Sequence, residues 1–210
     1  SYYLETLTTK VAEQAWALFL DVEEKGGFFA EVANGAVQAV IAETSAKRQK
    51  DVASRKEVLL GTNQFPNFTE NTNGKIENKE AKACKCGCTV ETGVQTLPNV
   101  RAAEQFEELR LATEASAKQP VAFMLTMGNL AMRLARAQFS CNFFACAGYK
   151  VIDNLGFETV EAGVKAAQEA GADIIVLCSS DDEYAELAPA AFKAIDGKQI
   201  FVVAGAPACM

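Results

Sequence analysis

The second half of the sequence predicts an α/β fold, with a parallel sheet covered by helices on both faces. Two observations indicate this. From residue 101 onward, four short apolar runs alternate with segments of helical periodicity. The runs are continuous and not alternating, which is typical of parallel strands buried on both faces. The first half has no such runs and predicts helices alone, so the chain contains two kinds of architecture.

Residues 1–66 predict three helices. The first carries apolar residues at three- and four-residue steps and ends at the glycine pair Gly26 and Gly27. A short helix follows over "FFAEVANG", and a third begins at Ala36 and runs through "AVIAETSAKRQKDVASRKE". Without strands among them, the apolar faces of these helices need another surface to pack on. We expect either a small helical bundle or the end of a larger domain.

Residues 67–100 are expected to form a linker, because so long a segment with little apolar periodicity is unusual inside a compact domain. The segment contains Cys84, Cys86 and Cys88 in the sequence "CKCGC". Thiolates bind zinc and iron–sulfur clusters, but such sites usually have four ligands at paired spacings. We therefore expect an exposed linker that binds no metal. A cysteine-rich metal or redox module is the alternative.

Residues 101–210 predict a helix followed by strands and helices in alternation. The first helix covers "RAAEQFEELRLATEASA". The expected strands are "VAFMLTMG", "YKVIDNL", "ADIIVLCSS" and "KQIFVVAGAP", and the expected helices between them cover 129–147, "TVEAGVKAAQEAG" and 182–195. A doubly wound domain normally continues to a fifth strand and a closing helix. We therefore expect this domain to be truncated.

The helix over 129–147 is apolar nearly all round. One predicted stripe consists of Leu130, Leu134, Ala137, Cys141 and Phe144. Further apolar residues lie on its other sides, namely Met132, Phe139, Phe143 and Cys146. A helix of this composition is buried on several faces. It is expected to be either a core helix or a helix that also meets another domain or subunit.

The loops after the strands offer few catalytic groups. The phosphate-binding patterns G-x-x-x-x-G-K and G-x-G-x-x-G are absent. In "CSSDDEYAEL", Ser180 or Asp181 is expected to cap the following helix, since acids are favoured in a first turn. A Ser/Asp site is the alternative there.

Composition excludes several classes of function. The net charge of −7 argues against binding of nucleic acid or anionic membranes, and no apolar run is long enough to span a bilayer. Several of the seven cysteines lie in apolar runs, which predicts buried free thiols in a reducing cytoplasm. The chain contains no histidine, so it offers no Ser-His-Asp triad, no Cys-His pair and no histidine metal ligand.

Two regions in succession resemble the methylmalonyl-CoA mutase family. "SYY", "AWALF", "EEKGG", "IAET" and "GTNQFPN" resemble the last helices of that family's acyl-CoA-binding TIM barrel. "RAAEQFEELRLATE" resembles the helix that leads into its cobalamin-binding domain. The resemblance covers nearly all of the chain except roughly 69–99, and it is closest to the non-catalytic chains of heterodimeric bacterial members. It implies a flavodoxin-like, cobalamin-binding-domain-like fold for 101–210.

The resemblance also implies where a cofactor site has been lost. Catalytic chains of the family carry D-x-H-x-x-G after the first strand, and its histidine coordinates cobalt while the aspartate supports that ligand. Here alanine replaces the aspartate and arginine replaces both the histidine and the glycine. The S-x-L motif after the third strand and the glycine pair after the fourth are altered as well. The degenerate positions are Ala131, Arg133, Arg136, Ser179, Asp181, Gly205 and Ala206.

Arginine stays protonated and cannot ligate cobalt. The resemblance therefore implies a chain without a cofactor and without catalytic residues, paired with a large catalytic subunit that holds adenosylcobalamin. In the family, that large subunit interconverts methylmalonyl-CoA and succinyl-CoA. The chain is expected to be a cytoplasmic structural subunit of a heterodimer. The alternative within the family is a mutase chain that binds cobalamin without a protein histidine.

Overall fold

A computed structural model describes residues 1–72, 93–97 and 100–206. The chain forms two compact units. The first contains residues 1–51 with the described part of 82–101, and the second contains the described parts of 52–81 and 102–210. The domain boundaries expected after residues 66 and 100 stay predictions. Cys84, Cys86 and Cys88 lie outside the described residues.

The first unit is helical, as predicted. It contains α1 (Tyr2–Glu24), α2 (Phe28–Ala33) and most of α3 (Ala36–Ala53). Gly26 and Gly27 end α1 with φ angles of 104° and 88°, a region that favours glycine. None of the residues of α1 is buried. The barrel that the family resemblance implies ahead of these helices is not visible in this chain.

The second unit contains a four-stranded sheet, and every strand pair in it is parallel. The strands are β1 (Val121–Thr126), β2 (Lys150–Ile152), β3 (Ile174–Cys178) and β4 (Ile200–Val203), in the order β2-β1-β3-β4. Phe123 of β1 lies opposite Ile152 on one side and Ile175 on the other. The parallel α/β fold predicted from the continuous apolar runs is confirmed.

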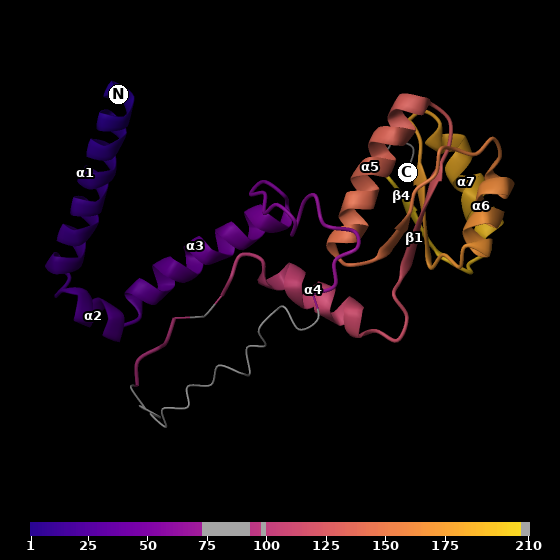
Figure 1. The fold of residues 1–210 in the computed structure, drawn as a ribbon. Coiled ribbons are helices and arrows are strands. Elements are labelled where there is room, and N and C mark those ends of the chain that lie inside the picture. The colour runs from indigo at the N-terminus through magenta and orange to yellow at the C-terminus, as the bar shows by residue number, and fades with distance from the viewer. Residues whose placement is uncertain (73–92, 98–99, 207–210) are drawn as a thin grey trace. The chain divides into compact units, whose positions relative to one another are not determined.

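Helices cover both faces of this sheet. The helices of the second unit are α4 (Glu104–Ala115), α5 (Leu130–Cys146), α6 (Val160–Glu169) and α7 (Tyr184–Ile195). Helix α5 lies on one face, and α6 and α7 lie on the other (Figure 1). In the described residues, no helix is long and apolar enough to cross a membrane.

Two hydrophobic clusters fill the spaces on either side of the sheet. Residues of β1 alternate between them: Phe123 and Leu125 pack toward α6 and α7, whereas Ala122 and Met124 pack toward α5. Every residue of β1 and β3 is buried. This alternation explains why the strands carry apolar residues at consecutive positions, since both faces need them.

The apolar stripe predicted for α5 is correct only in its second half. Ala137 and Cys141 are buried against the sheet. Leu130 and Leu134, however, are 58% and 44% exposed, so the prediction of their burial is wrong. The helix begins past the carboxyl end of β1, and its first turns therefore extend beyond the strands that would cover them.

The segment 52–72 belongs to the second unit, and side chains hold it both internally and against α5. Asn63 is fully buried and donates to the carbonyl oxygens of Val52 and Glu57 while accepting from the N–H of Leu59. The Arg55 guanidinium lies 5.1 Å from the ring centre of Phe139 on α5, a cation–π contact. These contacts depend on tertiary structure, and the sequence pattern did not predict them.

Candidate functional site at the carboxyl edge of the sheet

The candidate site is the edge of the sheet where the strands end and the loops begin. The strand order places β1 between β2 and β3, so the chain leaves β1 toward one side and β3 toward the other. Ligands of open α/β sheets bind outside the carboxyl ends of the strands at such a switch point. The degenerate motif positions all lie on this edge: three on the first turns of α5, two after β3 and two after β4.

Arg133 lies across the loops that follow β1 and β2. Its Nη1 donates to the carbonyl oxygen of Gly128 at 3.1 Å, and its Nη2 donates to that of Leu155 at 2.9 Å. The side chain lies so close to Gly156 that a Cβ there would overlap the guanidinium. Arg133 thus joins two loops through their backbones.

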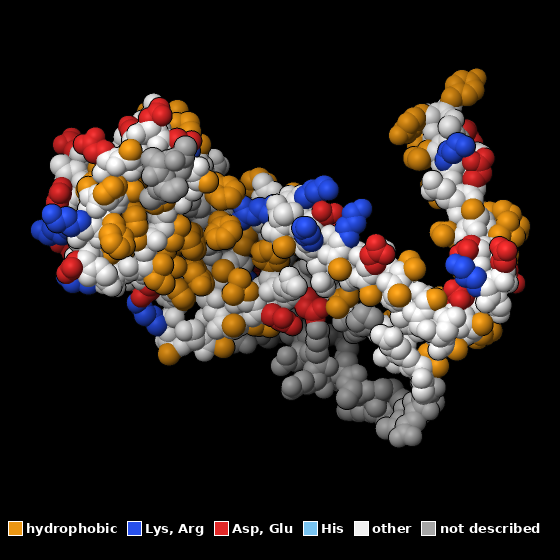
Figure 2. All heavy atoms as spheres, turned by 180° about the vertical axis from the view of Figure 1, so that it is seen from behind, with side chains coloured by type: hydrophobic (Ala, Val, Ile, Leu, Met, Phe, Trp, Pro, Cys, Tyr) orange, Lys and Arg blue, Asp and Glu red, His pale blue; other side chains and the backbone are white. Residues whose placement is uncertain are grey.

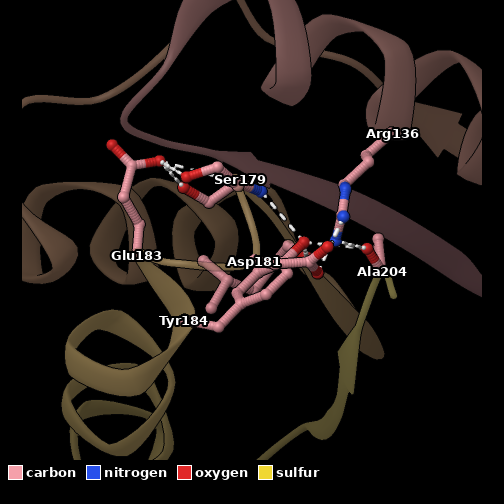
Figure 3. A network of polar contacts seen from close by, with 8 residues as sticks. Arg136, Ser179, Asp181, Glu183, Tyr184 and Ala204 are labelled. Carbon is pink, nitrogen blue, oxygen red and sulfur yellow. Dashed lines mark hydrogen bonds and ion pairs between the residues drawn. The ribbon is translucent and has the colours of Figure 1, made fainter. Parts of the chain in front are cut away.

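Arg136 makes a second bridge, between the loops after β3 and β4 (Figure 3). Its Nη1 donates to the carbonyl oxygen of Ala204 at 2.6 Å, and its Nη2 forms an ion pair with Asp181 at 2.8 Å. The Arg136 side chain is 17% exposed, and a Cβ on Gly205 would overlap its Nη1. The guanidinium therefore fills the space between these loops.

Tyr184 of α7 contacts both the Arg136 guanidinium and the two loops that Arg136 joins. Its ring lies 5.1 Å from the Arg136 guanidinium carbon, and its side chain is fully buried. The Tyr184 hydroxyl accepts from the N–H of Ser179 at 3.0 Å and donates to the Ala204 carbonyl oxygen at 2.8 Å. The Ala204 carbonyl therefore receives two donors, one from α5 and one from α7.

Glu183 links the loop after β3 to the start of α5. Its carboxylate accepts from the hydroxyls of Ser179 and Ser180, both at 2.6 Å, and from the N–H of Asn129 at 3.1 Å. These donors stabilise the charged form and lower the pKa of Glu183 to about 2. The carboxylate is thus ionised and fully engaged with the protein itself.

The expectation that Ser180 or Asp181 caps α7 is wrong. The N-cap position is Glu183, and no side chain makes a capping hydrogen bond there. Ser180 instead donates to Glu183, and Asp181 pairs with Arg136. Ser180 is thus engaged within its own loop and Asp181 with α5, so neither side chain is used at the helix terminus.

Sequence patterns identified only part of this network. Arg136, Ser179, Asp181 and Gly205 are brought together, and Arg133 lies apart from them, against the loops after β1 and β2. Ala131 and Ala206 are exposed and contribute no polar side-chain atom. Glu183 and Tyr184 were missed as partners. The one available signal was spacing, because Glu183 and Tyr184 follow Ser179 by four and five residues along a turn that begins a helix.

The buried cysteines of this unit are poorly suited to act as nucleophiles. Cys141, Cys146 and Cys178 are free and buried. Burial raises the pKa of Cys141 and of Cys178 to about 12, so both remain neutral thiols. Among the described residues, no group of three or more Cys, Asp or Glu side chains could hold a metal ion.

An apolar groove of about 400 Å³ opens beside Arg136, between α5 and β4. Phe139, Phe143, Phe144 and Val202 line it. Hydrophobic side chains gather on this unit in the view from behind (Figure 2). The groove offers van der Waals contacts, and its composition is that of a packing surface, without a set of polar groups converging on one point.

Fold and site together define a class: a doubly wound α/β unit of ligand-binding type whose ligand edge is occupied by its own side chains, preceded by a helical unit. The comparisons identify the family. The family model described as methylmalonyl-CoA mutase matches residues 1–142, and the chain belongs to this family.

Three relatives illustrate the similarity, and each is named a methylmalonyl-CoA mutase small subunit, the third as a probable one. The protein from Porphyromonas gingivalis is 58% identical over 210 residues, which are all of this chain and 34% of that protein. The protein from Streptomyces virginiae is 35% identical over 93% of this chain and 30% of its own length. The protein from Mycobacterium bovis is 31% identical over 91% and 29%. The chain thus spans about a third of the length of these relatives.

The residues at the carboxyl edge do not fit a cobalamin held through a protein imidazole. The chain has no histidine, and Arg133, where the resemblance predicts the motif histidine, has its guanidinium bonded to two backbone carbonyls. Arg136 and Gly205 are in such close approach that a Cβ on Gly205 would overlap the guanidinium, so this side chain occupies the space between the loops after β3 and β4. A permanently protonated group can neither coordinate cobalt nor be displaced without breaking these bonds.

Proposed function

We propose that the chain is the non-catalytic part of a methylmalonyl-CoA mutase complex, in which it serves as a structural subunit and holds no adenosylcobalamin. The partner is a large subunit that carries the cofactor and interconverts methylmalonyl-CoA and succinyl-CoA. The names of the relatives support the pairing, since a small subunit implies a larger one. The complex is proposed to be cytoplasmic, in line with the buried free thiols.

One observation carries this proposal: both arginines at the degenerate motif positions are used for bonds inside the protein. Arg133 and Arg136 each donate to a backbone carbonyl of a loop in which a ligand of this fold would lie. Arg136 is also paired with a carboxylate. The Nη atoms of both arginines are therefore bonded within the protein without a ligand, which suits a chain that contributes structure rather than chemistry.

Titration with hydroxocobalamin tests the absence of a cofactor. We expect the absorption spectrum of the cobalamin to be unchanged by the chain, because no imidazole can replace its lower ligand. A family member that carries the histidine serves as positive control. A spectral shift that saturates at one equivalent of chain would overturn this half of the proposal and favour a cobalamin-binding chain.

Co-expression with a large subunit tests the pairing. We expect the two chains to elute together in size-exclusion chromatography, with equal amounts of each. Mutase activity is expected only in fractions that contain the large subunit. Elution of the chain alone would contradict the structural role, and activity of the isolated chain would support the alternative of a catalytic mutase chain.

A further inference from the structure

We propose that Arg136 is a positioning residue that locks the loops after β3 and β4 onto α5, so that the carboxyl edge is held closed by the chain itself. In ligand-binding members of open α/β folds, these loops contact the ligand. Here a single side chain from α5 contacts both loops, through Asp181 and the Ala204 carbonyl. The proposal concerns conformation and holds whether or not the chain pairs with a large subunit.

The bonds of Arg136 connect α5 to the loops after β3 and β4 through side-chain contacts that add to the backbone bonds of the sheet. The β3 loop is held through Asp181, and the β4 loop is held through Ala204. Tyr184 of α7 supports the guanidinium from one side and donates to the same Ala204 carbonyl. The guanidinium has a planar fork of donors, which suits simultaneous contact with a carboxylate and a carbonyl.

When Arg136 is replaced, the two groups that it contacts can still form hydrogen bonds, either with the protein or with water. Asp181 is 58% exposed, so its carboxylate can be hydrated. The Ala204 carbonyl keeps the Tyr184 hydroxyl as a donor. No buried charge is left unpaired, and we therefore expect the variant Arg136→Met to fold.

Arg133 provides a matched control. It lies one turn earlier on the same helix, and it also bridges two loops through carbonyl oxygens. Its partners, however, follow β1 and β2. If Arg136 acts locally as proposed, Arg133→Met loosens only the β1 and β2 loops and leaves the other pair unchanged.

Hydrogen exchange of the full chain tests this inference at named amides. The reporters are the N–H groups of Ser179, Ala204 and Gly205, which bond to the Tyr184 hydroxyl and to the carbonyls of Leu177 and Val203. In Arg136→Met we expect these amides to exchange about three- to tenfold faster, the change that corresponds to loss of about one net hydrogen bond. Arg136→Lys, which keeps the charge and a donor, is expected to recover part of the protection.

Two results would overturn the inference. One is unchanged exchange at all three reporters in Arg136→Met, and the other is the same acceleration in Arg133→Met. Global unfolding is distinguished by the amides of β1, for which we expect no change. Because the test uses neither cobalamin nor a partner, its failure leaves the proposed function intact, and a cobalamin titration that fails leaves this inference intact.

Discussion

The two units differ in where their apolar side chains lie. In the second unit, every residue of β1 and β3 is buried between α5 on one side and α6 and α7 on the other. In the first unit, α1 runs for 23 residues without a buried one, and Tyr2, Trp16 and Phe19 are at least half exposed. The α/β unit therefore carries its own core, whereas α1 is held as a helix mainly by its backbone bonds. Large exposed apolar surfaces of this kind mark contact sites.

The largest effect should come from a substitution in the core of the α/β unit. Leu177 is fully buried in the cluster that β3 forms with α6 and α7. Leu177→Ala removes buried methyl groups and leaves a cavity, so we expect the free energy of unfolding to fall by about 2–5 kcal/mol. Urea unfolding followed by far-ultraviolet circular dichroism measures this change.

Leu18→Ala on α1 is the matched control for this comparison. Leu18 is 67% exposed, and alanine is a good helix former, so we expect a change within about 0.5 kcal/mol. A loss as large as that of Leu177→Ala would show that α1 is packed in solution, and the contrast between the two units would then disappear.

A smaller effect on the free energy of unfolding is expected from the charge of Glu183 at the carboxyl edge of the sheet. The pKa of Glu183 is lowered from 4.5 to about 2 by the serine hydroxyls and the Asn129 N–H. Because the folded pKa lies below the unfolded one, the carboxylate stabilises the fold above pH 4.5, and this contribution is lost as the pH falls toward 2. Urea unfolding across this range should show stability falling with pH.

Glu183→Gln isolates this contribution from other acids. Asp173 also has a lowered pKa, owing to the hydrogen bond from Lys118, so the variant keeps part of the acid dependence. We expect the difference in stability between the original chain and the variant to be constant above pH 4.5 and to shrink below it. If the stability difference between the two proteins does not vary with pH, the Glu183 carboxylate does not accept the stabilising hydrogen bonds from Ser179, Ser180 and Asn129.

The strands of the α/β unit were predictable because burial on both faces forces consecutive apolar residues. The run "VAFML" shows this constraint in the local sequence. The end of α1 is likewise visible locally, as the glycine pair Gly26 and Gly27. The absence of histidine was also evident in the sequence, and the family resemblance drew attention to Arg133 and Arg136.

The partners of these arginines were not predictable. Arg136 meets the Ala204 carbonyl 68 residues away, a contact that exists only because β4 lies beside β3. The predicted burial of Leu130 and Leu134 on α5 was wrong for a similar reason. Periodicity shows which residues share a face of a helix, but it does not show where the sheet beneath that face ends. Local patterns predict elements, and long-range contacts decide which residues of an element are covered.

The smallest expected effect concerns tryptophan fluorescence, which tests directly whether α1 is exposed. Trp16 is the single tryptophan of the chain, is 61% exposed, and stacks on Phe19 at 5.2 Å. Its fluorescence should therefore resemble that of a hydrated indole and be quenched readily by acrylamide. Leu177→Ala should shift the dichroism transition without moving the tryptophan signal, because non-coincident probes report separate transitions. Emission typical of a buried indole, together with slow quenching, would mean that α1 is covered in solution, and its apolar residues would then belong to an interface and not to an open surface.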